Sequence, residues 1–160
     1  MRAIVVDEFG PPEQLRVGEM PIPVHGPGEV LVTIHAAPVN YVDRLVVGGT
    51  YQFLPPRPFV PGKGPAGVVT ALGADVTTLQ VGDRVLAMAE QGGYAEAVTV
   101  PAENCYRLPS GMSFVEAASL SLVYDTAWFA LRERARYQLG DTVLVLGATG
   151  GVGLAAVQLA

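Results

Sequence analysis

Apolar and polar positions alternate in short runs along the first hundred or so residues, a pattern typical of β-strands. The runs Arg2–Asp7 and Leu15–Glu19 are short and end at proline-containing turns, while residues 29–37 form the longest run, rich in β-branched residues. Four more strands are predicted downstream: Ala66–Leu72, Arg84–Ala89, Gly93–Val100 and Cys105–Leu108. Several short strands at this spacing predict a β-barrel.

Two segments interrupt these strands. Asn40–Val47 is predicted as a short helix with Asn40 as its N-cap and Asp43 supporting the first turn, although Pro38 just before it also allows an irregular turn. Tyr51–Pro65 holds five prolines and is predicted as an ordered loop that runs extended over the surface. Ordered loops of this length usually serve a function.

The hydrophobic period changes from two residues to 3.6 after Pro109. Ser113-Phe-Val-Glu116 is a capping-box sequence that predicts a helix over Phe114–Ser121, and Thr126–Gln138 is predicted as an amphipathic helix. The change predicts a domain boundary that divides the chain into residues 1–125 and 126–160.

The chain ends in a strand, a glycine-rich turn and a helix. Asp141–Leu146 is a near-continuous apolar run, which is typical of a parallel strand covered on both faces, and Leu154–Ala160 has strong helix formers. Between them Gly150, Gly151, Val152 and Gly153 would open the helix, whose free N–H groups and dipole attract a phosphate. Ala148 stands where G-x-G-x-x-G has its first glycine, so the match is partial. The flanking strand and helix favour a dinucleotide site over a plain tight turn.

One strand and one helix do not complete a dinucleotide-binding domain, because a doubly wound sheet needs several more β–α units. Two alternatives follow. Either the chain is part of a longer protein, or its exposed strand Asp141–Leu146 pairs with another copy. In the second case the protein would be a non-catalytic interaction module that self-associates.

Composition and charge narrow the class of partner. Half of the residues are hydrophobic, so the chain can bury a sizeable core. A net charge of −5 without any run of Lys or Arg argues against nucleic acid or an anionic membrane as the partner. The single cysteine, Cys105, cannot form an internal disulfide, and neither a signal peptide nor a membrane span is evident, so a cytoplasmic location is expected.

Six motifs, in order, resemble the zinc-free quinone oxidoreductases of the medium-chain dehydrogenase/reductase superfamily. They are Ala37–Asp43, Pro61–Gly67, Val81–Val85, Gly92–Glu96, Asp125–Trp128 and Gly150–Gly153. The resemblance covers the whole chain. It implies a mostly β fold with some α+β elements: a GroES-like barrel followed by the first strand and helix of an incomplete Rossmann domain, as in the N-terminal half of that family.

The resemblance also implies an activity. In that family NADPH gives a hydride to a quinone or an activated alkene. NADPH is carried over from the family, and NAD stays open, because the residue that distinguishes them lies about 20 residues beyond the glycine turn. Residues 1–160 alone are expected to be weakly active or inactive. Family members are often homodimers, so a homodimer is expected for the complete protein.

Further roles are implied for single residues. Asn40 would donate from its amide to a substrate carbonyl as well as cap its helix, and Tyr51 would contact a flat substrate or pack against the proline-rich loop. Thr126, expected at the start of its helix, would bind the nicotinamide carboxamide or act as an N-cap. Gly150, Gly151, Val152 and Gly153 would approach the pyrophosphate.

No zinc site is expected. Zinc-dependent relatives bind catalytic zinc through Cys and His at positions that match Asn40 and Lys63 here, and two histidines with one cysteine cannot assemble such a site. Lys63 would pair with Asp43, or else lie beside a carbonyl oxygen.

Overall fold

Seven strands form, all in the part of the chain where alternation predicts them. They are β1 (Arg2–Val5), β2 (Arg16–Glu19), β3 (Glu29–Ala36), β4 (Ala66–Leu72), β5 (Arg84–Ala87), β6 (Ala97–Pro101) and β7 (Cys105–Arg107). The computed structural model describes residues 1–160, which group into two compact units, Met1–Ala118 and Ser119–Ala160. All strands belong to the first unit. A functional domain boundary after residue 125 stays a prediction.

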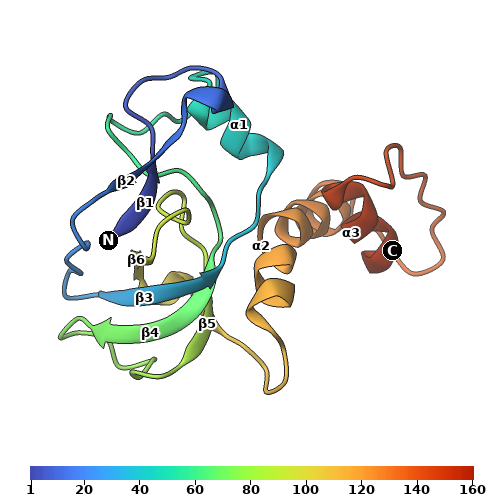
Figure 1. Ribbon diagram of the computed structural model, residues 1–160. Helices are drawn as coiled ribbons and strands as arrows, with labels where there is room; N and C mark the ends of the chain where they lie inside the picture. Colours follow the sequence, from blue (N-terminus) through green and yellow to red (C-terminus); the bar gives the residue numbers. More distant parts are fainter. The chain divides into compact units, whose positions relative to one another are not determined.

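The strands make one open sheet and one separate ribbon. The five-stranded sheet is antiparallel with the order β6-β3-β4-β5-β7, and β3, β4 and β5 lie side by side in it (Figure 1). The ribbon β1-β2 joins the rest through isolated bridges of Ala3 with Ala95 and of Val6 with Phe59. The predicted barrel is therefore mostly β as expected but not closed, because β7 and β2 pair on one side only.

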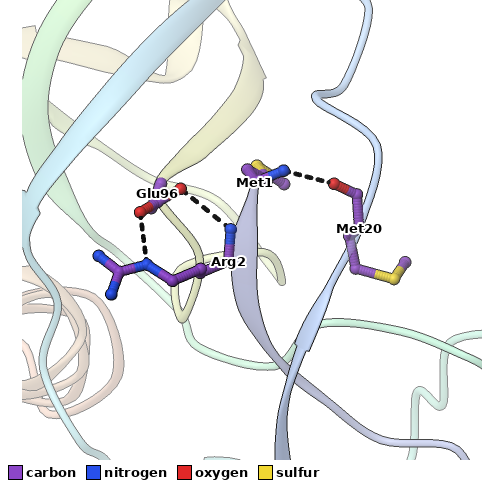
Figure 2. A network of polar contacts seen from close by, with 4 residues as sticks. All are labelled: Met1, Arg2, Met20 and Glu96. Carbon is purple, nitrogen blue, oxygen red and sulfur yellow. Dashed lines mark hydrogen bonds and ion pairs between the residues drawn. The ribbon is translucent and has the colours of Figure 1, made fainter.

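Polar contacts fasten the ribbon to the segment that precedes β6. Figure 2 shows the Glu96 carboxylate accepting hydrogen bonds from both the backbone N–H and the side-chain Nε of Arg2, each at 2.9 Å. The Met1 ammonium donates to the Met20 carbonyl at 2.8 Å (Figure 2). These contacts hold the start of the chain against the segment before β6 and against the residue that follows β2.

The core of the sheet consists mainly of valines at alternate positions, as the strand pattern requires. Its buried valines are Val30, Val32, Val69, Val85, Val98 and Val100. β-Branched side chains suit this environment because their restricted χ1 angles pack well on a pleated surface. The core therefore gives the first unit a rigid platform.

Helix α1 (Tyr41–Val47) packs on a second apolar cluster. Its buried residues Val46 and Val47 contact Val6 and Phe59. Two 3₁₀ turns, η1 (Pro12–Gln14) and η2 (Ala102–Asn104), complete the connections in this unit.

The proline-rich segment Tyr51–Pro65 forms no helix and no strand, as predicted. Its predicted path over the surface is wrong for the last part, because Pro61–Pro65 is buried. The backbone there is paired: Gly92 donates to the Val60 carbonyl at 2.8 Å, and Gly64 donates to the Ala89 carbonyl at 3.1 Å. This pairing satisfies the polar groups that burial would otherwise leave unbonded.

Beyond Ser113 the chain forms helices and no strand. Helix α2 (Phe114–Trp128) begins at the predicted capping box, where the Glu116 carboxylate accepts from the Ser113 backbone N–H at 2.7 Å. The predicted break between two helices is wrong: α2 continues through residues 121–126, which contain neither Gly nor Pro, and one π-helical turn, η3 (Phe129–Arg134), follows. No helix has the length and hydropathy that crossing a bilayer requires.

The predicted strand Asp141–Leu146 is not formed. The segment is irregular and leads into α3 (Gly151–Leu159), with Leu144 and Leu146 exposed at 83% and 85%. A strand needs a hydrogen-bonded neighbour, and none lies beside this run. Pairing of this run with another copy, the second alternative, stays a prediction.

Candidate functional site

The N-terminus of α1 begins at Asn40, as the sequence predicts. Asn40 has an extended backbone conformation, and its N–H donates to the Asp43 carboxylate at 2.8 Å. This is the reciprocal contact that a residue three positions into a helix makes with its N-cap. The alternative of an irregular turn is wrong.

Asp43 is held by a residue from a distant part of the chain. Its side chain is buried, and the Tyr94 hydroxyl lies 2.8 Å from the same carboxylate oxygen and 3.1 Å from the Pro38 carbonyl oxygen. Burial of the phenol, together with the hydrogen bond to Asp43, raises the pKa of Tyr94 well above its ordinary value. Tyr94 therefore stays a proton donor, and Asp43 braces the helix start.

The Asn40 side chain carries an unsatisfied hydrogen-bond donor. Its Nδ2 atom is buried and has no hydrogen-bond partner in the chain. A buried amide donor without a partner is costly, and such donors are often found where a ligand supplies the acceptor. This fits the predicted role as donor to a substrate carbonyl.

A cavity of about 650 Å³ lies between α1 and the proline-rich segment, entirely within the first unit. Its lining consists of Val46, residues 51–55, Lys63, Glu90 and Gln91. Tyr51 and Phe53 meet edge to face there, with ring centroids 6.4 Å apart. The volume and the mixture of rings with a few polar groups are typical of a small-molecule site.

Lys63 lies at the wall of this cavity and is only 6% exposed. Glycines with left-handed backbone angles flank it, Gly62 at φ 98° and Gly64 at φ 61°, and let the chain turn sharply on both sides. The ammonium pairs with Glu90, so the predicted pair with Asp43 is wrong. The Asp43 carboxylate is already bonded to Tyr94 and to the Asn40 N–H.

Tyr51 stands where a flat substrate could reach it. Its ring lines the cavity, and the Lys63 Nζ atom lies 5.5 Å from the ring centroid. Tyr51 also packs on the apolar cluster around Phe59. The two predicted alternatives, substrate contact and loop packing, are compatible in this geometry.

Thr126 does not start a helix. It lies inside α2, and its hydroxyl donates to the Leu122 carbonyl at 2.7 Å, so its predicted place at a helix N-terminus is wrong. Such a back-bond is common for a threonine within a helix. Its role toward a cofactor stays a prediction.

The glycine turn opens α3 as predicted. Gly150 is the N-cap, and Gly151, Val152 and Gly153 form the first turn, where backbone N–H groups have no partner within the helix. A Cβ on Gly153 would lie 2.2 Å from the Gly147 carbonyl oxygen, so only glycine fits this close approach. The turn fits a pyrophosphate, which binds to free N–H groups at a helix start.

Other candidate chemistry is limited. No group of three or more His, Cys, Asp or Glu residues is placed to hold a metal ion. Burial raises the pKa of the Cys105 thiol to about 11, which leaves it protonated and unreactive at neutral pH. His35 stacks on Phe114 with ring centroids 4.5 Å apart, a packing role.

The sequence analysis missed two members of this site. Tyr94 bonds Asp43 across 51 residues, and Glu90 neutralises Lys63 across 27 residues. The signal for Tyr94 was its place after Gly92-Gly93 in one of the six motifs, but a motif does not reveal a partner. Glu90 lies in none of the six motifs.

Comparisons with known proteins agree on one family. The profile of the alcohol dehydrogenase GroES-like domain matches residues 26–110, just over half of the chain. Human quinone oxidoreductase is 40% identical over 162 aligned residues, which cover 100% of this chain and 49% of that protein. The chain thus spans about half the length of the curated relatives it matches.

Solved structures give the same picture. A human synaptic vesicle membrane protein VAT-1 homolog-like protein has a TM-score of 0.95 at 39% identity, covering 99% of this chain and 52% of that one. Quinone oxidoreductase from Thermus thermophilus, solved also as its complex with NADPH, has a TM-score of 0.86 at 36% identity, covering 99% of this chain and 49% of that one.

Proposed function

Because the chain belongs to the alcohol dehydrogenase GroES-like domain family, we propose that it forms the acceptor-binding part of an NADPH-dependent oxidoreductase that reduces a quinone or an activated alkene. One observation carries this proposal: identity of about 40% to quinone oxidoreductases extends along the whole chain. The complex of such a relative with NADPH supports the choice of cofactor.

The cavity would hold the acceptor. Tyr51 lines this cavity and offers a ring face. Asn40 is not part of the lining, so its unpartnered Nδ2 would donate to an acceptor carbonyl that reaches beyond the cavity to the start of α1. NADPH would supply the hydride when bound, and such a transfer needs positioning more than acid–base groups. The resemblance implies that Asn40 and Lys63 replace the zinc ligands of zinc-dependent relatives, so the chemistry would not require zinc.

The cofactor would be held by the glycine turn and by α2. Gly150, Gly151, Val152 and Gly153 would bind the pyrophosphate through backbone N–H groups. Thr126 would bind the nicotinamide carboxamide only by giving up or sharing its bond to Leu122. A cytoplasmic location and a homodimer remain predictions, which fractionation and light scattering of the complete protein would test.

The Asn40 role can be separated from its capping role. Asn40→Ser keeps a side chain suited to an N-cap but removes the amide donor, whereas Asn40→Ala removes both. In the protein expressed from its complete reading frame, we expect both variants to lower kcat/KM for a quinone by about tenfold. Only Asn40→Ala should also lower the melting temperature. NADPH oxidation followed by absorbance measures the first effect, and calorimetry the second.

Unchanged kcat/KM in Asn40→Ser would remove Asn40 from the site while leaving the oxidoreductase proposal standing. Absence of NADPH oxidation with every quinone and enone tried would overturn the proposal itself.

A further inference from the structure

Lys63 is the only lysine of the chain, and the fold buries it. An ammonium loses much of its hydration when buried and is rarely placed so without a compensating partner. Here the ammonium lines the cavity described above, beside the Tyr51 ring. Its position therefore calls for an explanation beyond packing.

The ion pair between Lys63 and its partner is weak because that partner is solvated. Glu90 is the hydrogen-bond partner of the ammonium, and its side chain is 87% exposed. An ammonium has three N–H donors, so two remain without a partner in the chain. An ion pair with one solvated carboxylate is easily exchanged for another anion.

The rest of the cavity wall complements a ring. Tyr51, Phe53 and Leu54 line it, and Lys63 and Glu90 are its only charged side chains. A ligand that combines a flat apolar body with a negatively charged oxygen would satisfy both the rings and the free ammonium donors. A neutral ligand would leave Lys63 with Glu90 alone.

We propose that Lys63 is a specificity-determining residue that makes this cavity favour flat acceptors with an anionic or enolate-like oxygen, and that Glu90 is a counter-ion which the ligand displaces. The identification of the ligand as an acceptor rests on the proposed function. Lys63 donates hydrogen bonds to the oxygen through the N–H groups that Glu90 leaves free. It therefore stabilises the negative charge that an acceptor oxygen gains during reduction.

Two probes of similar size test the preference on residues 1–160. They are 2-hydroxy-1,4-naphthoquinone, which is an anion at neutral pH, and neutral 2-methyl-1,4-naphthoquinone. Calorimetry should show that the anion binds about tenfold more tightly than the neutral probe. A ¹³C label on lysine gives one side-chain signal, which should shift with the anion.

The two variants act in opposite directions. Lys63→Met should weaken binding of the anion by about tenfold and leave the neutral probe within about twofold. Glu90→Gln should strengthen binding of the anion by about threefold, because the competing carboxylate is gone. Arg107→Gln is the matched control for net charge: Arg107 is exposed and pairs with Asp83, away from the cavity, and the variant should change neither affinity.

The inference is overturned if the anion-to-neutral ratio is the same in wild type, Lys63→Met and Glu90→Gln. It is also overturned if Arg107→Gln lowers anion binding as much as Lys63→Met. If Lys63→Met fails to fold, the increase in anion affinity expected for Glu90→Gln still tests the inference, and its absence overturns it. If the complete protein reduces no quinone but the ratio responds as expected, the proposed function fails and the Lys63 inference stands.

Discussion

Tyr94 and Asp43 illustrate how one buried hydrogen bond can fix the start of a helix. The Asp43 carboxylate accepts from the Asn40 N–H on its own helix and from the Tyr94 hydroxyl, 51 residues further along the chain. Of these two hydrogen bonds, only the one from the Tyr94 hydroxyl joins residues that are distant in the sequence. It locks α1, and with it Asn40, to the segment that precedes β6.

Removal of that hydroxyl should destabilise the first unit. Tyr94→Phe leaves a buried carboxylate oxygen with one donor fewer, which costs about 1–3 kcal/mol of unfolding free energy. Tyr106→Phe is the matched control, because the Tyr106 side chain is exposed, and it should change stability by less than about 0.5 kcal/mol. Urea unfolding measures both. Equal effects would mean that the Asp43 contact contributes nothing.

Gly153 lies so close to the backbone of Gly147 that it leaves no room for a side chain. A Cβ there would lie 2.2 Å from the Gly147 carbonyl oxygen, whereas a Cβ on Gly150 would meet the same oxygen at 3.5 Å, an ordinary contact. Gly153→Ala should therefore displace the turn, and Gly150→Ala should leave it in place. Amide chemical shifts of residues 147–154 are the measurement. Similar perturbation by both variants would contradict the close approach.

At the scale of elements, the capping box of α2 couples stability to pH. Hydrogen bonds from the backbone N–H and then the hydroxyl of Ser113 lower the pKa of Glu116. A carboxylate with a lowered folded-state pKa adds stability above its unfolded-state pKa and loses it as pH falls through the folded-state value.

The variant Glu116→Gln should show this directly. It cannot ionise, so the stability difference from wild type should be greatest above the unfolded-state pKa of glutamate, about 4.3, and should shrink as pH falls through the lower folded-state value. Thermal unfolding at a series of pH values measures the difference. A difference that stays constant with pH would rule out the charge of Glu116 as its source.

Most elements could be predicted from the sequence because their signals are local. Alternating valines predict β3 and β4, and Ser113 with Glu116 predicts the start of α2. One wrong prediction depends on a partner that is distant in the sequence. Asp141–Leu146 has the composition of a buried strand but no neighbouring strand, and composition cannot reveal that. The predicted break in α2 at residues 121–126 is wrong, and the sequence there has no Gly or Pro to cause one.

The candidate site was predictable to a smaller extent, for the same reason. The motifs correctly indicated Asn40 as an N-cap and Gly150 as the start of α3. They did not show that Lys63 is buried against Glu90, since that depends on how two loops pair. Thr126 was misplaced because its position followed from the wrong helix boundary.

At the scale of the whole molecule, the chain carries two unequal parts of the proposed site. The cavity and the residues proposed to hold the acceptor lie in the first unit, and the glycine turn lies in the second. The relatives extend to about twice the length of the chain. A dinucleotide needs several β–α units for its full site, and residues 119–160 offer α3 and its turn.

The central claim is that these residues belong to an NADPH-dependent oxidoreductase whose activity needs more than residues 1–160. The most direct test measures NADPH oxidation with a quinone by two samples side by side: residues 1–160 and the protein expressed from the complete reading frame. We expect saturable oxidation at an ordinary enzymatic rate only in the second. Absence of oxidation in the complete protein, or an equal rate in residues 1–160, would contradict the account.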